Sequence, residues 1–138
     1  MTSARYRQTF AFGGFISVRI LIADDSPFWR GELRAILERD SSWIVFEASN
    51  GSEAVKKATS IHPDVVILDL WMPVLDGLGA ARELKHSRPE LLVVICTVDK
   101  SAFLEAAARQ AGVLAVFSKM ECIEVRNFLT RRLQTAAA

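Results

Sequence analysis

Five polar residues stand at the ends of short apolar runs in this sequence. They are Asp24, Asp25, Asp69, Thr97 and Lys119. Taken singly, each has an ordinary explanation, since an aspartate often caps a helix and a lone lysine is usually solvated. Taken together, the three carboxylates would repel one another unless a cation neutralised them. Oxygen ligands without His or Cys favour Mg²⁺ as that cation.

The apolar runs themselves predict strands of a buried sheet. Runs rich in Val, Ile and Leu are typical of strands covered on both faces, and a more mixed run is typical of a strand nearer an edge. The second of the five runs is the mixed one. The predicted strands are Val18–Ala23, Trp43–Ala48, Val65–Leu68, Leu91–Cys96 and Val113–Phe117.

Segments with helical spacing of apolar residues alternate with these runs. A Ser, Asn or Asp before the first turn is a favoured N-cap, and Pro is favoured within that turn. We expect helices after Ser26-Pro27, after a cap at Asn50 or Ser52, from Gly77, and over Ala102–Ala111 with Ser101 as the cap. The last helix presents one apolar face made of Cys122, Val125, Leu129 and Leu133.

This alternation predicts an α/β fold, (βα)₅, in which the strands are parallel because a helix connects each strand to the next. Right-handed crossovers with helices on both faces give a doubly wound, flavodoxin-like sheet of five parallel strands in the order 2-1-3-4-5. Ligands of such sheets bind beyond the carboxyl ends of the strands. The five polar residues therefore converge on one edge, where we expect the functional site.

The residues and their spacing resemble the response-regulator receiver family of bacterial two-component signalling. The resemblance covers about Val18 to Leu133, and an acid pair followed by a longer block carries most of its specificity. It implies a phosphorylation-dependent switch in which Asp69 accepts a phosphoryl group from a sensor histidine kinase or a histidine phosphotransfer protein. The matching pieces are Asp24-Asp25-Ser26, Asp69-Leu-Trp-Met-Pro-Val-Leu-Asp-Gly77, Thr97 and Lys119.

The same resemblance implies a metal site with Mg²⁺ as cofactor. Asp25 and Asp69 would bind Mg²⁺ directly, together with the backbone carbonyl of Trp71. Asp24 would act mainly through metal-bound water. The charges would balance, because three carboxylates would face one divalent cation and the ammonium group of Lys119.

Thr97 and Lys119 would contact phosphoryl oxygens. In many family members the threonine is coupled to an aromatic residue at the second switch position, which is Val116 here, so we do not expect the usual coupling. Phe117 points to the opposite face of its strand and is expected in the core. Met120 replaces the proline common after the lysine, and we expect a trans peptide bond there because a non-proline cis bond costs about 3–4 kcal/mol.

Three residues beside the site are candidates for tuning the lifetime of the phosphoryl group. They are Trp71, Val98 and Asp99. Val98 is bulkier than the small residue frequent after the threonine, and Asp99 adds a carboxylate at the rim. We expect Trp71 to shield the acyl phosphate from water. The alternative is that Trp71 is an exposed aromatic residue used in partner docking.

Length, charge and cysteine content limit the functions open to the chain. Its 138 residues suit one domain, and a net charge of +1 gives no reason to expect binding to nucleic acid or to a membrane surface. No run approaches the roughly 18 apolar residues of a membrane helix.

Cys96 and Cys122 lack metal or redox spacing and are expected to be buried reduced thiols, although their separation does not exclude a disulfide. We expect a flexible or partly ordered extension over residues 1–17, a receiver domain over residues 18–138, and a cytoplasmic location.

The leading hypothesis is a stand-alone receiver that signals by binding a downstream protein and is not a turnover enzyme. One alternative is the excised receiver of a longer regulator. Another is a phosphorylation-independent docking module, which Val116 and Met120 favour and the complete set of site residues disfavours. A Mg²⁺-dependent phosphohydrolase of the haloacid-dehalogenase type would have an aspartate at the place of Trp71. The expected output surface, and the surface of a homodimer if one forms, consists of helix 102–111, strand 113–117 and the last helix, with Phe103 as a candidate contact.

Overall fold

The computed structural model describes residues 17–137. The predicted N-terminal extension, residues 1–17, therefore lies outside the described residues except for Ser17. Five parallel strands form one sheet in the predicted order, β2-β1-β3-β4-β5. The strands are β1 (Val18–Ala23), β2 (Trp43–Ala48), β3 (Val65–Leu68), β4 (Leu92–Thr97) and β5 (Ala115–Ser118).

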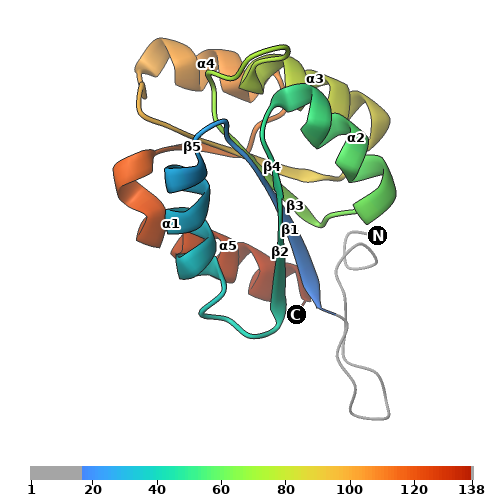
Figure 1. Ribbon diagram of the computed structural model, residues 1–138, viewed down its shortest axis with the longest axis vertical. Helices are drawn as coiled ribbons and strands as arrows, with labels where there is room; N and C mark the ends of the chain where they lie inside the picture. Colours follow the sequence, from blue (N-terminus) through green and yellow to red (C-terminus); the bar gives the residue numbers. More distant parts are fainter. Residues whose placement is uncertain (1–16, 138) are drawn as a thin grey trace.

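Helices cover both faces of this sheet, as Figure 1 shows. One apolar layer packs α1 and α5 against the sheet, and the other packs α2, α3 and α4 against its opposite face. No helix among residues 17–137 is long and apolar enough to cross a membrane. The helices are α1 (Pro27–Leu37), α2 (Gly51–Ile61), α3 (Gly77–Ser87), α4 (Ala102–Gln110) and α5 (Cys122–Ala137), and a short 3₁₀ turn, η2 (Lys119–Glu121), precedes α5.

Side-chain caps set where the helices begin. Asn50 accepts a hydrogen bond from the backbone N–H of Glu53 at 2.8 Å, so Asn50 rather than Ser52 is the N-cap of α2. The same kind of bond begins three other helices, each of which follows the carboxyl end of a strand. Their caps are Ser26 for α1, Asp76 for α3 and Ser101 for α4.

The fourth strand is shifted by one residue from its predicted bounds. The N–H of Leu91 donates to the carbonyl of Arg88 at 3.0 Å and so closes a turn instead of joining the sheet. At the other end Thr97 pairs in register with Ser118 of β5. The prediction that β4 ends at residue 96 is therefore wrong by one position, because the threonine itself belongs to the ladder.

The fifth strand begins two residues later than predicted. The N–H of Val113 donates to the carbonyl of Ala108 in α4 at 2.9 Å, so this apolar residue completes the end of a helix. That helix ends at Gln110, one residue before the predicted end. Gly112 follows with φ +91°, a conformation that favours glycine, and turns the chain toward β5.

Candidate functional site

The carboxyl ends of four strands place the predicted polar residues at one edge of the sheet. Asp24 follows β1, Asp69 follows β3, Thr97 ends β4 and Lys119 follows β5. These four residues are buried, whereas Asp25 is exposed. Buried polar groups require partners, because an unpaired charge in a low-dielectric environment is costly.

Main-chain hydrogen bonds fix the two buried aspartates to the sheet. The N–H of Asp24 donates to the carbonyl of Ala48 in β2 at 3.1 Å, and the N–H of Asp69 donates to the carbonyl of Ala23 at 2.9 Å. Each carboxylate also accepts a backbone N–H at 2.9 Å, from the residue two positions later for Asp24 and from the next residue for Asp69. These bonds leave one oxygen of each carboxylate directed toward other partners.

The loop that follows Asp69 packs against the start of α3 at a contact that requires glycine. The N–H of Gly77 donates to the carbonyl of Leu70 at 2.8 Å. A Cβ atom at Gly77 would lie 2.2 Å from the backbone oxygen of Asp69 and 2.9 Å from Cα of Leu70. The glycine that ends the sequence block is therefore needed for a close approach of two backbone segments beside the site.

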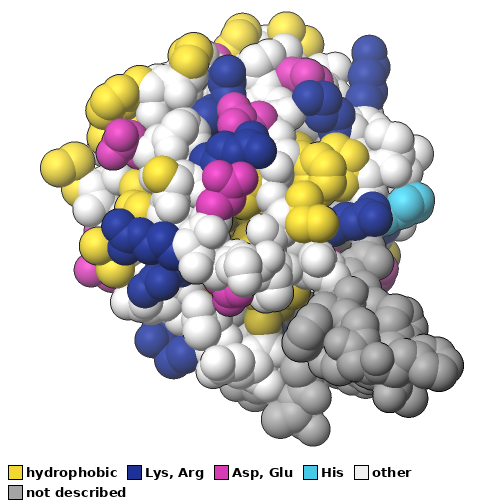
Figure 2. All heavy atoms as spheres, turned by 60° about the horizontal axis from the view of Figure 1, so that its bottom comes forward, with side chains coloured by type: hydrophobic (Ala, Val, Ile, Leu, Met, Phe, Trp, Pro, Cys, Tyr) yellow, Lys and Arg dark blue, Asp and Glu magenta, His cyan; other side chains and the backbone are white. Residues whose placement is uncertain are grey.

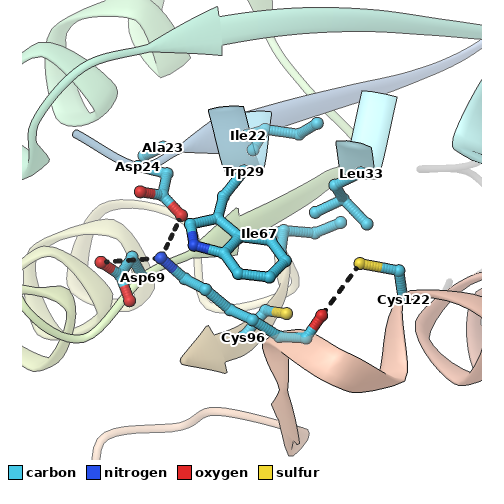
Figure 3. A pocket seen from close by; sticks show the side chains of 10 residues that line it. Ile22, Ala23, Asp24, Trp29, Leu33, Ile67, Asp69, Cys96 and Cys122 are labelled. Atoms are coloured by element: carbon cyan, nitrogen blue, oxygen red, sulfur yellow. Dashed lines mark hydrogen bonds and ion pairs between the residues drawn. The ribbon is translucent and has the colours of Figure 1, made fainter. Parts of the chain in front are cut away.

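Lys119 connects the two buried aspartates. Its Nζ atom lies 2.7 Å from Oδ2 of Asp24 and 3.5 Å from Oδ2 of Asp69, contacts drawn as dashed lines in Figure 3. The same ammonium lies 5.6 Å from the centroid of the Trp29 ring, within the range of a cation–π contact. The lysine is thus held between two carboxylates and an aromatic ring.

The surroundings shift the pKa values of both partners. Burial, and then the negative charge of Asp24, raises the pKa of Asp69, and the nearby Lys119 only partly opposes this. Burial alone would lower the pKa of Lys119, but its hydrogen bond and charge interaction with Asp24, joined by the charge of Asp69, raise the pKa above 10.5. The lysine therefore stays charged, and the site has an excess of negative charge once Asp25 is counted.

The three aspartates could hold a divalent cation. Asp24, Asp25 and Asp69 each offer one carboxylate oxygen, and these oxygens lie within 4.8 Å of one another. Ligands of one Mg²⁺ ion lie about 2.0–2.1 Å from the metal, so neighbouring ligand oxygens of an octahedral ion are about 3 Å apart. The three oxygens would have to approach one another by at most about 2 Å to reach that spacing. An all-oxygen donor set of this charge suits Mg²⁺.

The residues predicted to tune phosphoryl lifetime surround this edge. Trp71, Val98 and Asp99 are all exposed, and 57% of Trp71 is accessible to solvent. The N–H of Asp99 points at Oγ1 of Thr97 at 3.5 Å. The roles of these three residues, and that of the Trp71 carbonyl as a metal ligand, stay predictions.

The chain departs from its apparent relatives at two positions, Val116 and Met120. Val116 is buried in the layer formed with α4, while Phe117 points to the other layer and contacts Phe128 of α5 edge to face, with ring centroids 5.5 Å apart. No peptide bond among residues 17–137 is cis, so the bond between Lys119 and Met120 is trans.

Sequence reasoning missed Trp29. It lies on the first turn of α1, four residues after Asp25, and side chains there lean back toward the helix N-terminus. Its ring lines a cavity of about 10 Å³, enough for about one water molecule, and Cys96 and Cys122 line the same cavity. Figure 3 shows these side chains. Both thiols are free. Burial raises the pKa of Cys96 to about 12, and Cys122 is half-buried, not fully buried as predicted.

Comparison with known proteins connects this geometry to a family. The family described as "Response regulator receiver domain" matches residues 20–127. The chain is 36% identical over 94 residues to the chemotaxis protein CheY of Bacillus subtilis, covering 68% of this chain and 78% of that one. It is 41% identical over 106 residues to a protein-glutamate methylesterase/protein-glutamine glutaminase of Methanosarcina acetivorans, covering 75% of this chain but only 30% of that protein.

A solved structure agrees with the sequence matches. The response regulator domain of Thermotoga maritima CheB superposes with a TM-score of 0.75 at 27% identity, covering 88% of this chain and 96% of that one. The chain spans about a third of the length of the methylesterase relatives it matches. The activity in their names is therefore a property of those longer proteins.

Proposed function

This chain belongs to the family of response regulator receiver domains, and from that premise we propose that it is a switch in which Asp69 accepts a phosphoryl group with the help of Mg²⁺. Receiver domains of this kind carry out phosphorylation-dependent signalling. The donor we propose is a sensor histidine kinase or a histidine phosphotransfer protein. One observation carries the proposal: three carboxylates within 4.8 Å of one another lie beside the ammonium group of Lys119.

The transfer step follows from the positions of these groups. An oxygen of the Asp69 carboxylate attacks the phosphorus of a phosphohistidine, an acyl phosphate P–O bond forms, and the P–N bond breaks. The imidazole nitrogen leaves with the electron pair of that bond and is protonated from solvent. The attacking group is the carboxylate itself, so no proton has to be removed from it as the P–O bond forms. Positioning and charge neutralisation supply the catalysis.

The groups that would hold Mg²⁺ directly are the carboxylates of Asp25 and Asp69 and the backbone carbonyl of Trp71. Asp24 would act through bound water. When bound, the cation neutralises charge on the phosphoryl oxygens. Lys119 would pair with one phosphoryl oxygen, and the hydroxyl of Thr97 would donate a hydrogen bond to another. Thr97 is completely buried at the end of β4, and its Oγ1 atom accepts from the N–H of Asp99 at 3.5 Å, so its hydroxyl proton could be donated to an incoming oxygen.

We propose that phosphorylation is read by a protein partner at the surface formed by α4, β5 and α5. Phe103 of α4 is 85% exposed, which supports its role as an apolar contact. A homodimer through the same surface is a second possible use. Because Val116 is small and buried, movement of a large ring at that position does not transmit the signal in this chain.

The alternatives are compatible with the same fold to different degrees. An excised receiver would work in the same way and differ only in a further output domain. The phosphohydrolase is disfavoured by Trp71, which offers no carboxylate to protonate a leaving group. A phosphorylation-independent module would have no need of the buried Lys119 and its two carboxylate partners. Two free thiols, one with a pKa of about 12, agree with a reducing cytoplasm.

The test is incubation with MgCl₂ and acetyl phosphate followed by intact mass spectrometry. We expect one phosphate adduct on the wild type, none on Asp69→Asn, and none in excess EDTA. Glu83→Gln is the control, because it removes an exposed carboxylate of α3 that lies outside the acid cluster. An adduct that persists in Asp69→Asn, or its absence from wild type with both acetyl phosphate and a competent kinase, would refute the proposal.

A further inference from the structure

Arg30 lies outside the acid cluster and binds the backbone between Asp24 and Asp25, two of the three aspartates of that cluster. Nη1 of Arg30, on α1, donates to the backbone carbonyl of Asp24 at 2.7 Å. This short bond from a charged donor is stronger than one between neutral groups. The carbonyl belongs to the peptide that joins Asp24 to Asp25. Its orientation therefore sets the direction in which the side chain of Asp25 leaves the backbone.

Asp25 depends on this peptide more than its neighbours do. The carboxylates of Asp24 and Asp69 are fixed by Lys119 and by backbone N–H groups. Asp25 is exposed, and within the described residues no hydrogen bond or ion pair reaches its carboxylate. The placement of its oxygen within 4.8 Å of the other two is therefore determined by its backbone.

The arginine is itself anchored to the sheet. Nε of Arg30 lies 2.8 Å from Oε1 of Glu47 on β2, and the other oxygen of Glu47 lies 2.6 Å from Nη1 of Arg34. These bonds, first that of Arg34, lower the pKa of Glu47. Arg34 extends the row to Glu38 at 3.0 Å. Figure 2 shows that acidic and basic side chains lie next to one another on one face of the molecule.

We propose that Arg30 is a positioning residue for the metal site: anchored by Glu47, it holds the Asp24–Asp25 peptide so that Asp25 meets the other two carboxylates. The inference rests on the proposed Mg²⁺ site and adds to it a residue that touches neither metal nor phosphate. Partners that orient metal ligands typically affect metal affinity about tenfold or more when removed.

The sign of the effect separates positioning from simple electrostatics. Arg30 is a cation near a cation site, so Coulomb repulsion alone would make Mg²⁺ bind more tightly when Arg30 is removed. Loss of positioning makes Mg²⁺ bind more weakly. Arg34 is the matched control, because it binds the same glutamate from the same helix but has no bond to Asp24.

The experiment is calorimetric titration of MgCl₂ into the full chain and its variants, with melting temperatures measured in EDTA. We expect Arg30→Ala to weaken Mg²⁺ binding about tenfold and Arg34→Ala to leave it within twofold of wild type, although both variants lose thermal stability. Arg30→Lys keeps the side-chain stem and charge but cannot make both bonds in the same geometry. It should fold and bind Mg²⁺ more weakly than wild type.

Two outcomes would overturn the inference. One is Mg²⁺ affinity within twofold of wild type, or tighter, in both Arg30 variants. The other is an equal loss in Arg34→Ala, which would show that the whole charged row acts only through stability. If the wild type does not bind Mg²⁺, the proposed function is what fails, so the two failures are distinguishable.

Discussion

Lys119 is bonded to Asp24 at 2.7 Å, more closely than to Asp69, the residue whose phosphoryl group it is proposed to contact. Before phosphorylation the ammonium group of Lys119 therefore neutralises Asp24, the aspartate that we propose contacts Mg²⁺ through a bound water molecule. A cation at the acid cluster would take over that neutralising role and compete with Lys119 for Asp24. The lysine would then be free to turn toward new oxygens on Asp69.

Competition of this kind predicts that Lys119→Met binds Mg²⁺ more tightly than the wild type. The ammonium group and a divalent cation about 6 Å apart near a protein surface repel by up to about 5 kcal/mol before solvent screening, so a gain of at least about tenfold in affinity is expected. Calorimetric titration measures it. Unchanged or weaker binding would mean that Lys119 and Mg²⁺ do not compete for the same carboxylate.

The raised pKa of Asp69 has a consequence for stability. The folded chain holds this proton more tightly than the unfolded chain, in which the pKa is near 3.8, so the contribution of Asp69 to stability falls as pH rises from about 3.8 through the folded-state pKa. Asparagine does not ionise, so Asp69→Asn removes this loss of stability with rising pH. In EDTA at pH 7 we expect the free energy of unfolding of the variant to exceed that of the wild type by about 1 kcal/mol, and we expect this difference to shrink toward pH 4.

Urea unfolding of both proteins at several pH values measures this difference. Saturating Mg²⁺ should reduce the advantage of the variant, because the metal stabilises only a protein whose carboxylates can bind it. A difference that does not change with pH would show that the asparagine acts through packing and not through the charge of Asp69.

The sequence was sufficient for the fold and for the members of the acid cluster. Buried parallel strands are continuous apolar runs, and Asp24, Asp69, Thr97 and Lys119 follow or end such runs directly, so topology alone brings them together. The end of β4 was harder, because Thr97 is polar yet completely buried and pairs with Ser118. A hydropathy pattern assigns such a residue to a loop.

The residues that sequence reasoning missed act across elements far apart in the chain. Trp29 reaches Lys119, and Arg30 connects Asp24 with Glu47, through contacts between α1 and three different strand ends. Helical spacing shows only that these side chains lie near the start of α1. Which strand end each one meets depends on how the helix is docked, and that is a property of the packed layers.

Gly77 gives a steric prediction with an internal control. Its replacement by alanine would place Cβ 2.2 Å from the backbone oxygen of Asp69, and backbone atoms cannot move aside as a flexible side chain can. We expect Gly77→Ala to lose about 1–3 kcal/mol of stability and to slow phosphorylation. Gly31 lies at an exposed position of α1, and no atom lies within 4 Å of a Cβ atom added there, so Gly31→Ala should gain up to about 1 kcal/mol of stability. Chemical denaturation measures the free energy of unfolding of both variants. Equal changes in Gly77→Ala and Gly31→Ala would refute the steric argument.

Val74 stores backbone strain in the loop between β3 and α3. Its φ is +72°, a conformation costly for a β-branched residue, and the N–H of Leu75 donates to the carbonyl of Pro73 across it at 2.8 Å. The side chain is 83% exposed, so little burial is lost on replacement. Val74→Asn should therefore stabilise the chain by about 1 kcal/mol. Val98 is also exposed but has no positive φ, so Val98→Asn should not stabilise the chain. An equal gain in stability in Val98→Asn would point to solubility instead of backbone strain.

Trp71 offers the sharpest test of how the phosphoryl group is protected. The ring stands two residues after Asp69 and is 57% exposed, so it can lie over the mouth of the site without being part of the core. A large ring that excludes water from an acyl phosphate slows its hydrolysis. We expect Trp71→Ala to lose phosphate severalfold faster than wild type while its melting temperature changes little.

The measurement is decay of the phosphorylated mass after the donor is removed, in wild type, Trp71→Ala and Trp71→Phe. Shielding by ring area predicts an intermediate rate for the phenylalanine variant. The competing use of Trp71 in docking predicts equal decay rates and a slower transfer only from a kinase, with transfer from acetyl phosphate unchanged. Because the small donor needs no docking surface, comparing it with a kinase separates a residue that protects the product from one that recruits the donor.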